Sequence, residues 1–194
     1  PLRRDRVQPV PPGQPRPVIN SSANAAFNLS GAITNVRDLT IHHTGTFTGL
    51  AVLSTSGTIE RVDVRSSGFE ACSIGLDILM RDSICAATNP NGTALSRDFS
   101  GGTTTMKLRN VTAIATGTSS KGIFVSATSS GYNAVDAKNV IAQGGLYDIQ
   151  TQRTAPVDFA SVVLTNSNYD TVNAGAGTSI TAPGSSPARR AKCS

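Results

Sequence analysis

A six-residue pattern that recurs six times restricts the possible folds more than any other feature of this sequence. Successive copies begin 21 to 29 residues apart. Their first, fourth and sixth residues are almost always apolar or small, and their second and third residues are always polar. This spacing suits a chain that turns a corner after the first residue and then alternates in and out as a strand. The copies are VRDLTI (36–41), IERVDV (59–64), MRDSIC (80–85), LRNVTA (108–113), AKNVIA (137–142) and LTNSNY (164–169).

Each copy is followed by a turn and two further short apolar runs, so that one period contains three short strands. Glycine often marks the first turn, at Gly45, Gly68, Gly117 and Gly145. Such a period predicts an all-β parallel solenoid of about six coils, whose coils bury a core only by stacking on one another. A β-sandwich also fits the strand lengths, but its strands need no matching side chains at matching offsets. We expect the fourth residues to form one inward column in one continuous parallel sheet: Leu39, Val62, Ser83, Val111, Val140 and Ser167.

Variable turns on a constant strand frame make residues 27–182 resemble the pectin-lyase-like proteins, which share a right-handed parallel β-helix. The resemblance is one of rung pattern and implies fold far better than activity. It also implies an exported or surface protein that handles polysaccharide. The active sites of the family's lyases and hydrolases do not carry over, because they need clusters of acids on neighbouring rungs. Only one of the six outward fifth-position residues here is acidic: Thr40, Asp63, Ile84, Thr112, Ile141 and Asn168.

The formal charge of +5 belongs to the two ends of the chain. Residues 1–17, a proline-rich arm, and residues 183–194, a flexible tail, each carry a net +3, which leaves the 18–182 domain at about −1. A nucleic-acid-binding domain would carry a basic stripe on its folded surface, so we expect no nucleic-acid partner. No stretch is long and apolar enough to span a bilayer, and the chain begins without a signal-peptide core. We expect a secreted or cell-surface protein whose export signal lies outside this sequence.

The second and third positions of the first three copies alternate in charge from one copy to the next. Stacking would therefore place each charge between opposite charges, which predicts a structural ladder. The alternative is a binding or lyase site in which a cation neutralises a uronate and a base removes its α-proton. In the last three copies the third position is always asparagine, which predicts a side-chain amide ladder that caps a turn. These residues are Asn110, Asn139 and Asn166. The charged residues are Arg37, Asp38, Glu60, Arg61, Arg81 and Asp82.

Two histidines follow the first copy and supply the best candidate for catalysis. His42 and His43 lie near Asp63 and Arg65 of the next coil if the coils stack in register. An acid, a guanidinium and an imidazole on one patch can do acid–base work on a sugar. The alternative is that these are ordinary surface residues at a strand end.

The three cysteines, Cys72, Cys85 and Cys193, show no metal-ligand spacing, so we expect no metal and no cofactor. Cys72 and Cys85 lie thirteen residues apart, about half a coil, and either form a disulfide or pack as two small buried side chains.

Three functions remain open at this point. The first is a domain that binds or scaffolds carbohydrate without a recognisable catalytic site. The second is a polysaccharide lyase or hydrolase that uses the histidine patch. The third is a structural solenoid that stacks end to end, because no amphipathic helix precedes the first rung to cover its open edge.

Overall fold

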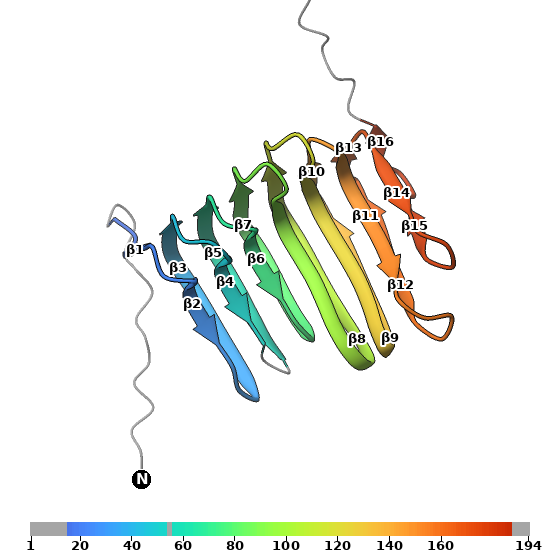
Figure 1. Cartoon of the computed structure of the whole chain (residues 1–194), viewed down its shortest axis with the longest axis horizontal. Helices are drawn as coiled ribbons and strands as arrows, with labels where there is room; N and C mark the ends of the chain where they lie inside the picture. Colours follow the sequence, from blue (N-terminus) through green and yellow to red (C-terminus); the bar gives the residue numbers. More distant parts are fainter. Residues whose placement is uncertain (1–14, 54–55, 188–194) are drawn as a thin grey trace, which may run out of the picture.

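The computed structural model describes residues 15–53 and 56–187 and shows a parallel β-solenoid of about six turns (Figure 1). Every strand pair in it is parallel, which confirms the predicted solenoid and excludes the sandwich. The strands are β1 (Val18–Ser21), β2 (Ala25–Leu29), β3 (Ile33–His43), β4 (Thr48–Val52), β5 (Ser56–Ser66), β6 (Glu70–Ile74), β7 (Asp77–Ala87), β8 (Thr93–Ala115), β9 (Lys121–Lys138), β10 (Ile141–Gln143), β11 (Tyr147–Arg153), β12 (Phe159–Thr165), β13 (Asn168–Tyr169), β14 (Val172–Ala174), β15 (Ser179–Thr181) and β16 (Ser186–Pro187).

The strands stack into three faces. Face 1 follows the hexapeptide corner and runs in the order β1-β3-β5-β7-β8-β10-β13-β16. Face 2 is built from β2, β4, β6, the first parts of β8 and β9, then β11 and β14. Face 3 contains the first halves of β3, β5 and β7, later parts of β8 and β9, then β12 and β15. The long strands therefore bend from one face to the next, as the curved ribbons show (Figure 1).

The hexapeptide corner has one backbone conformation in all six coils. Each third-position residue has a positive φ, between 48° and 56°. Asp and Asn tolerate this left-handed region better than other side chains, which explains why they occupy five of the six positions. The predicted amide ladder is confirmed for Asn110 and Asn139, because Asn110 Nδ2 donates to Asp82 Oδ1 at 2.9 Å and Asn139 Nδ2 donates to Asn110 Oδ1 at 3.1 Å. The residues are Asp38, Arg61, Asp82, Asn110, Asn139 and Asn166.

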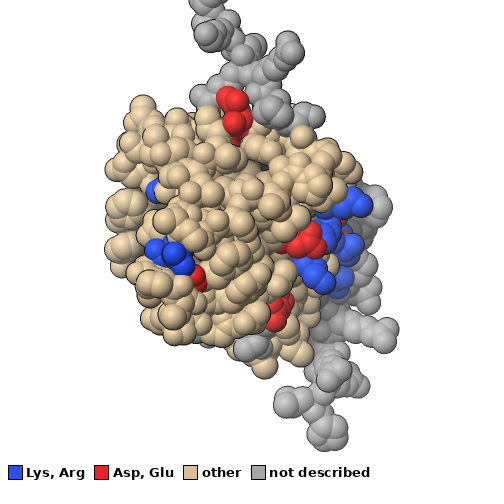
Figure 2. All heavy atoms as spheres, turned by 90° about the vertical axis from the view of Figure 1, so that its right-hand side faces the viewer, with Lys and Arg blue, Asp and Glu red and all other residues tan. Residues whose placement is uncertain are grey.

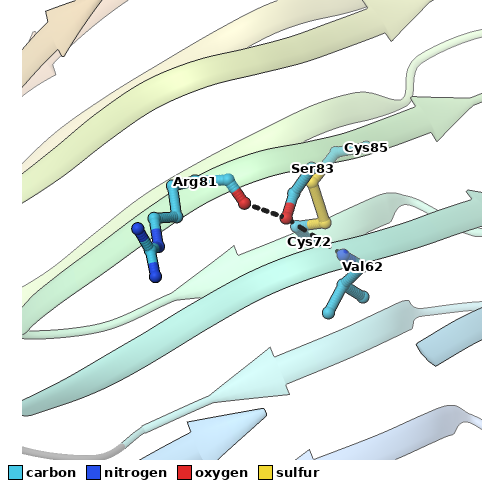
Figure 3. The surroundings of a disulfide bond; sticks show 5 residues. All are labelled: Val62, Cys72, Arg81, Ser83 and Cys85. Carbon is cyan, nitrogen blue, oxygen red and sulfur yellow. Dashed lines mark hydrogen bonds between the residues drawn. A yellow bond between two sulfur atoms is a disulfide. The ribbon is translucent and has the colours of Figure 1, made fainter. Parts of the chain in front are cut away.

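All six residues of the predicted inward column are buried, two of them serines. Ser83 Oγ accepts a hydrogen bond from the Val62 backbone N–H at 3.1 Å and donates to the Arg81 carbonyl at 2.7 Å (Figure 3). Ser167 likewise accepts from the Val140 N–H. The left-handed residue interrupts the ladder next to Val62, so the inward hydroxyl supplies a partner for a buried N–H group.

The corner between faces 1 and 2 explains the recurrent glycines. A Cβ atom on Gly45 would lie 1.9 Å from the Ala23 carbonyl oxygen, and one on Gly145 would lie 1.9 Å from that of Gly117. Gly68 and Gly117 have the same problem against the turn of the preceding coil. The turns stack with their backbones in direct contact, and only glycine permits that approach.

The interior is a single apolar core that a disulfide crosses. Cys72 from β6 and Cys85 from β7 are bonded across the inside of one coil, beside Ser83 (Figure 3). This decides between the two alternatives left open for these cysteines.

The ends of the stack are where the predicted arm and tail join it and where self-association was predicted. Most of the arm and tail lies outside the described residues, although β16, within the segment predicted as a tail, pairs with β13. Among the described residues, β1, β2 and the start of β3 form one edge, and β14, β15 and β16 form the other. Self-association through these edges stays a prediction.

The described chain forms no helix long and apolar enough to cross a membrane.

Candidate functional site

The charged residues of the hexapeptides form pairs between neighbouring coils. Glu60 is in register with Arg37 on one side and Arg81 on the other, and Arg81 Nη2 donates to Glu60 Oε2 at 2.8 Å. Arg61 also contacts Glu60. The predicted alternation is therefore present in the fold. Figure 2 shows one large cluster of charged side chains on one side of the stack and a smaller group on the opposite side, with much of the visible end between them uncharged.

The most complete pair of this ladder joins Arg61 to Asp38. Arg61 Nε and Nη2 donate to the two Asp38 oxygens at 2.7 and 2.9 Å, a bidentate arrangement. The hydrogen bonds from Arg61 lower the pKa of the Asp38 carboxyl below its usual value, against the opposing effect of desolvation. The pair also holds Arg61 in a left-handed conformation that arginine does not favour.

Asp38→Asn should lower stability at neutral pH by about 1 kcal/mol, because the pair is partly exposed and partly screened by solvent. The folded-state pKa of Asp38 is depressed, so its contribution is present above the unfolded-state value near 4 and is lost as pH falls through the folded-state value. The free energies of unfolding of wild type and variant, measured in urea, should therefore become equal as pH falls from 7 towards 2. A constant gap across this range would contradict the assignment, and Asp98→Asn, an exposed carboxylate outside the ladder, is the control.

A groove of about 940 Å³ lies beside coils one to three, at the end of the stack that begins with β1. Phe27, Leu29 and Ile33 are apolar residues of its lining, and Asn35 and Thr58 add polar groups. Four of the six charged residues predicted for binding also line it, namely Arg37, Asp38, Glu60 and Arg81. Arg61 and Asp82 are not among the lining residues. The sequence indicated an open edge at the first rung, but it did not indicate that the ladder residues border a groove there.

The predicted histidine patch is only partly assembled. Asp63, Arg65 and His42 lie on the outside of face 1, with Arg65 Nη2 3.2 Å from Asp63 Oδ2 and His42 in register with Arg65. Asp63 Oδ1 is buried and has no hydrogen-bond partner among the described residues.

His43 points into the stack, so the expectation that both histidines share one patch is corrected. Its side chain is 2% exposed, with Nε2 2.8 Å from the Ala23 carbonyl and Nδ1 2.8 Å from Ser66 Oγ. The Ala23 carbonyl oxygen can only accept, so Nε2–H donates to it, and Nδ1 is paired with the Ser66 hydroxyl. Both ring nitrogens of His43 are thus used in joining three coils.

The remaining patch offers limited chemistry. Glycoside hydrolysis generally needs two carboxyl groups across one bond, and Asp63 is the only carboxylate in the patch. The described residues also contain no group of three or more His, Cys, Asp or Glu that could hold a metal ion.

Arg97 is a buried cation that the hexapeptide repeat does not include. It is 0% exposed and stands in the inward column of face 2, where Nη1 donates to the Leu76 carbonyl at 2.7 Å and Nη2 donates to Thr104 Oγ1. Burial lowers the pKa of the Arg97 guanidinium to about 10, although the nearby charge of Asp77 opposes this effect. Leu76 has a φ of 55°, so Arg97 satisfies a carbonyl at a second left-handed corner. The sequence did contain a signal for this burial, because strand alternation places Arg97 inside when its neighbours Ser96 and Asp98 point outward.

Comparison of this chain with protein-family models, with curated proteins and with solved structures found no match.

Proposed function

We propose that this solenoid is an exported, non-catalytic scaffold that binds carbohydrate in the groove beside coils one to three. The observation that carries the proposal is the make-up of the groove. Phe27, Leu29 and Ile33 supply apolar surface to a lining that also contains Asn35, Thr58 and the Glu60–Arg81 pair. A sugar ring presents C–H groups on its faces and hydroxyl groups at its rim, which suits a lining that mixes apolar and polar side chains.

The charges of the groove favour a neutral saccharide over a uronate. Arg37 and Arg81 are balanced by Asp38 and Glu60, so the lining has no excess of positive charge to attract an anion. Carboxylate and guanidinium groups fixed by their own pairing can still accept from and donate to adjacent hydroxyl groups. The groove is open at the surface, which suits a segment of a longer polysaccharide.

The disulfide supports the export part of the proposal. Disulfides persist in secreted and surface proteins and are rare where thiols are kept reduced. Cys72 and Cys85 are both fully buried in the bonded pair.

Glu60→Gln should weaken binding of a neutral polysaccharide at least about tenfold, because it removes a charged acceptor worth roughly 1.5–3 kcal/mol per hydrogen bond. Affinity electrophoresis in gels containing mannan, β-glucan or galactan measures this, with polygalacturonate as the charged comparison. Asp136→Asn is the matched control, because Asp136 pairs with Arg109 at 2.6 Å on the same face but does not line the groove.

Two results would count against the proposal. One is that none of these polysaccharides retards the wild-type protein. The other is that Glu60→Gln and Asp136→Asn change retardation equally. Unchanged thermal unfolding of Glu60→Gln is required, so that lost binding is not lost folding.

A further inference from the structure

The outside of face 2 differs from the other outer surfaces in carrying a central column without charged side chains. Strand register places Ala51, Ser73, Ser96, Phe124 and Gln150 in line on successive coils. The small side chains of the first three make a flat strip, and the strip ends at the ring of Phe124. This column lies on a different face from the groove residues Arg37, Glu60 and Arg81, which belong to face 3.

Two polar atoms on either side of Phe124 lack hydrogen-bond partners. Ser96 faces outward between Leu95 and Arg97, yet it is 1% exposed and its Oγ has no partner. Gln150, one coil beyond Phe124, has a buried Oε1 with no partner. Buried polar atoms are nearly always hydrogen-bonded, so two such atoms flanking one outward ring indicate groups that a ligand completes. Only four side-chain atoms of this kind occur in the described part of the chain.

A cation lies over the Phe124 ring, and two other rings lie along the same face. Lys121 Nζ lies 5.2 Å from the centre of the Phe124 ring, so a ligand that stacks there takes the place of a long, flexible side chain. Phe47 and Phe69, with ring centres 6.2 Å apart, are half-exposed at the turns before β4 and β6, on coils nearer the start of the stack.

We infer that Phe124, Ser96 and Gln150 form a second saccharide subsite, so that one domain holds two carbohydrate segments on different faces. The C–H face of a sugar packs on the ring, and its hydroxyl groups donate to Gln150 Oε1 and Ser96 Oγ. These two residues are two coils apart, about 10 Å at the usual strand spacing, so a ligand that reaches both is longer than one sugar ring. The inference rests on the proposed function and extends it from binding to cross-linking of polysaccharide.

Beads coated with the neutral polysaccharide that retards the wild-type protein test the inference. A wild-type monomer should agglutinate them, and calorimetry with a short oligosaccharide of the same sugar should give two sites. Phe124→Ala should leave one site and abolish agglutination while groove binding persists. Gln150→Leu keeps the side-chain volume and removes the acceptor, so it should act in the same direction if Phe124→Ala folds poorly. Tyr132→Ala, which removes a half-exposed ring stacked on Phe159 at another corner, is the control.

The outcomes separate this inference from the proposed function. If Glu60→Gln alone abolishes all binding and Phe124→Ala changes nothing, the second subsite is refuted while the groove stands. If Phe124→Ala and Gln150→Leu each remove one of two sites and Tyr132→Ala removes none, the subsite is supported. Loss of all binding in Phe124→Ala with no effect of Glu60→Gln refutes the groove and leaves a single site on face 2. If the wild type binds none of the polysaccharides, both proposals fail.

Discussion

Gly145→Ala should destabilise the solenoid by about 3 kcal/mol, the upper end of what overpacking usually costs. Its new methyl group would lie 1.9 Å from the Gly117 carbonyl oxygen and 3.1 Å from the Thr118 Cα, and both of these are backbone atoms. Side-chain rotation cannot relieve a clash with backbone, so the stacked turns must separate and lose contact between two coils. A midpoint decrease of about 6 °C or more is expected in thermal unfolding.

Gly75→Ala is the matched control for this substitution. A Cβ atom at Gly75 would lie 3.4 Å from its nearest neighbour, the Val52 carbonyl oxygen, which is ordinary van der Waals contact. The expected change is within about 0.5 kcal/mol. Equal effects of the two substitutions would show that the turns at Gly117 and Gly145 are not stacked in direct contact.

Replacing both Cys72 and Cys85 with alanine should cost about 3 kcal/mol, the value expected for a disulfide that closes a loop of this length. The bond constrains the unfolded chain, and it joins faces 1 and 2 inside the third coil. Urea unfolding without reductant gives the difference directly. Both sulfur atoms are buried, so mild reductant should not reproduce the effect on the folded protein.

Cys193→Ala is the control for the double substitution, because Cys193 lies outside the described residues and is the third cysteine of the chain. It should leave the free energy of unfolding unchanged. If the double substitution costs nothing and the wild-type protein shows three free thiols after unfolding, the disulfide assignment is refuted, and with it the support that the bond lends to export.

The hexapeptide repeat determined much of the fold before any tertiary information. Alternation from Leu39 to Ile41 assigned inside and outside positions, and the corner was indicated by polar residues that tolerate left-handed backbone. The same alternation assigns His43 to the inside, because it follows Ile41 by two residues. The placement of His43 on a surface patch overlooked that signal. The ladder at Glu60 followed from stacking alone, since a constant strand frame fixes which side chains are neighbours.

Only the tertiary structure decided the features that depend on how the coils close. Thirteen residues between Cys72 and Cys85 allowed a bond or none, and the distance across the coil interior settled it. The groove forms because residues of the first coil lie beside the charge ladder. Arg97 is buried because a separate corner turns the Leu76 carbonyl inward, where it accepts a hydrogen bond from the guanidinium. The unpartnered atoms around Phe124 likewise appear only when three coils are in register. A repeat specifies which residues lie above one another, whereas cavities and buried polar contacts arise between segments that the repeat does not relate.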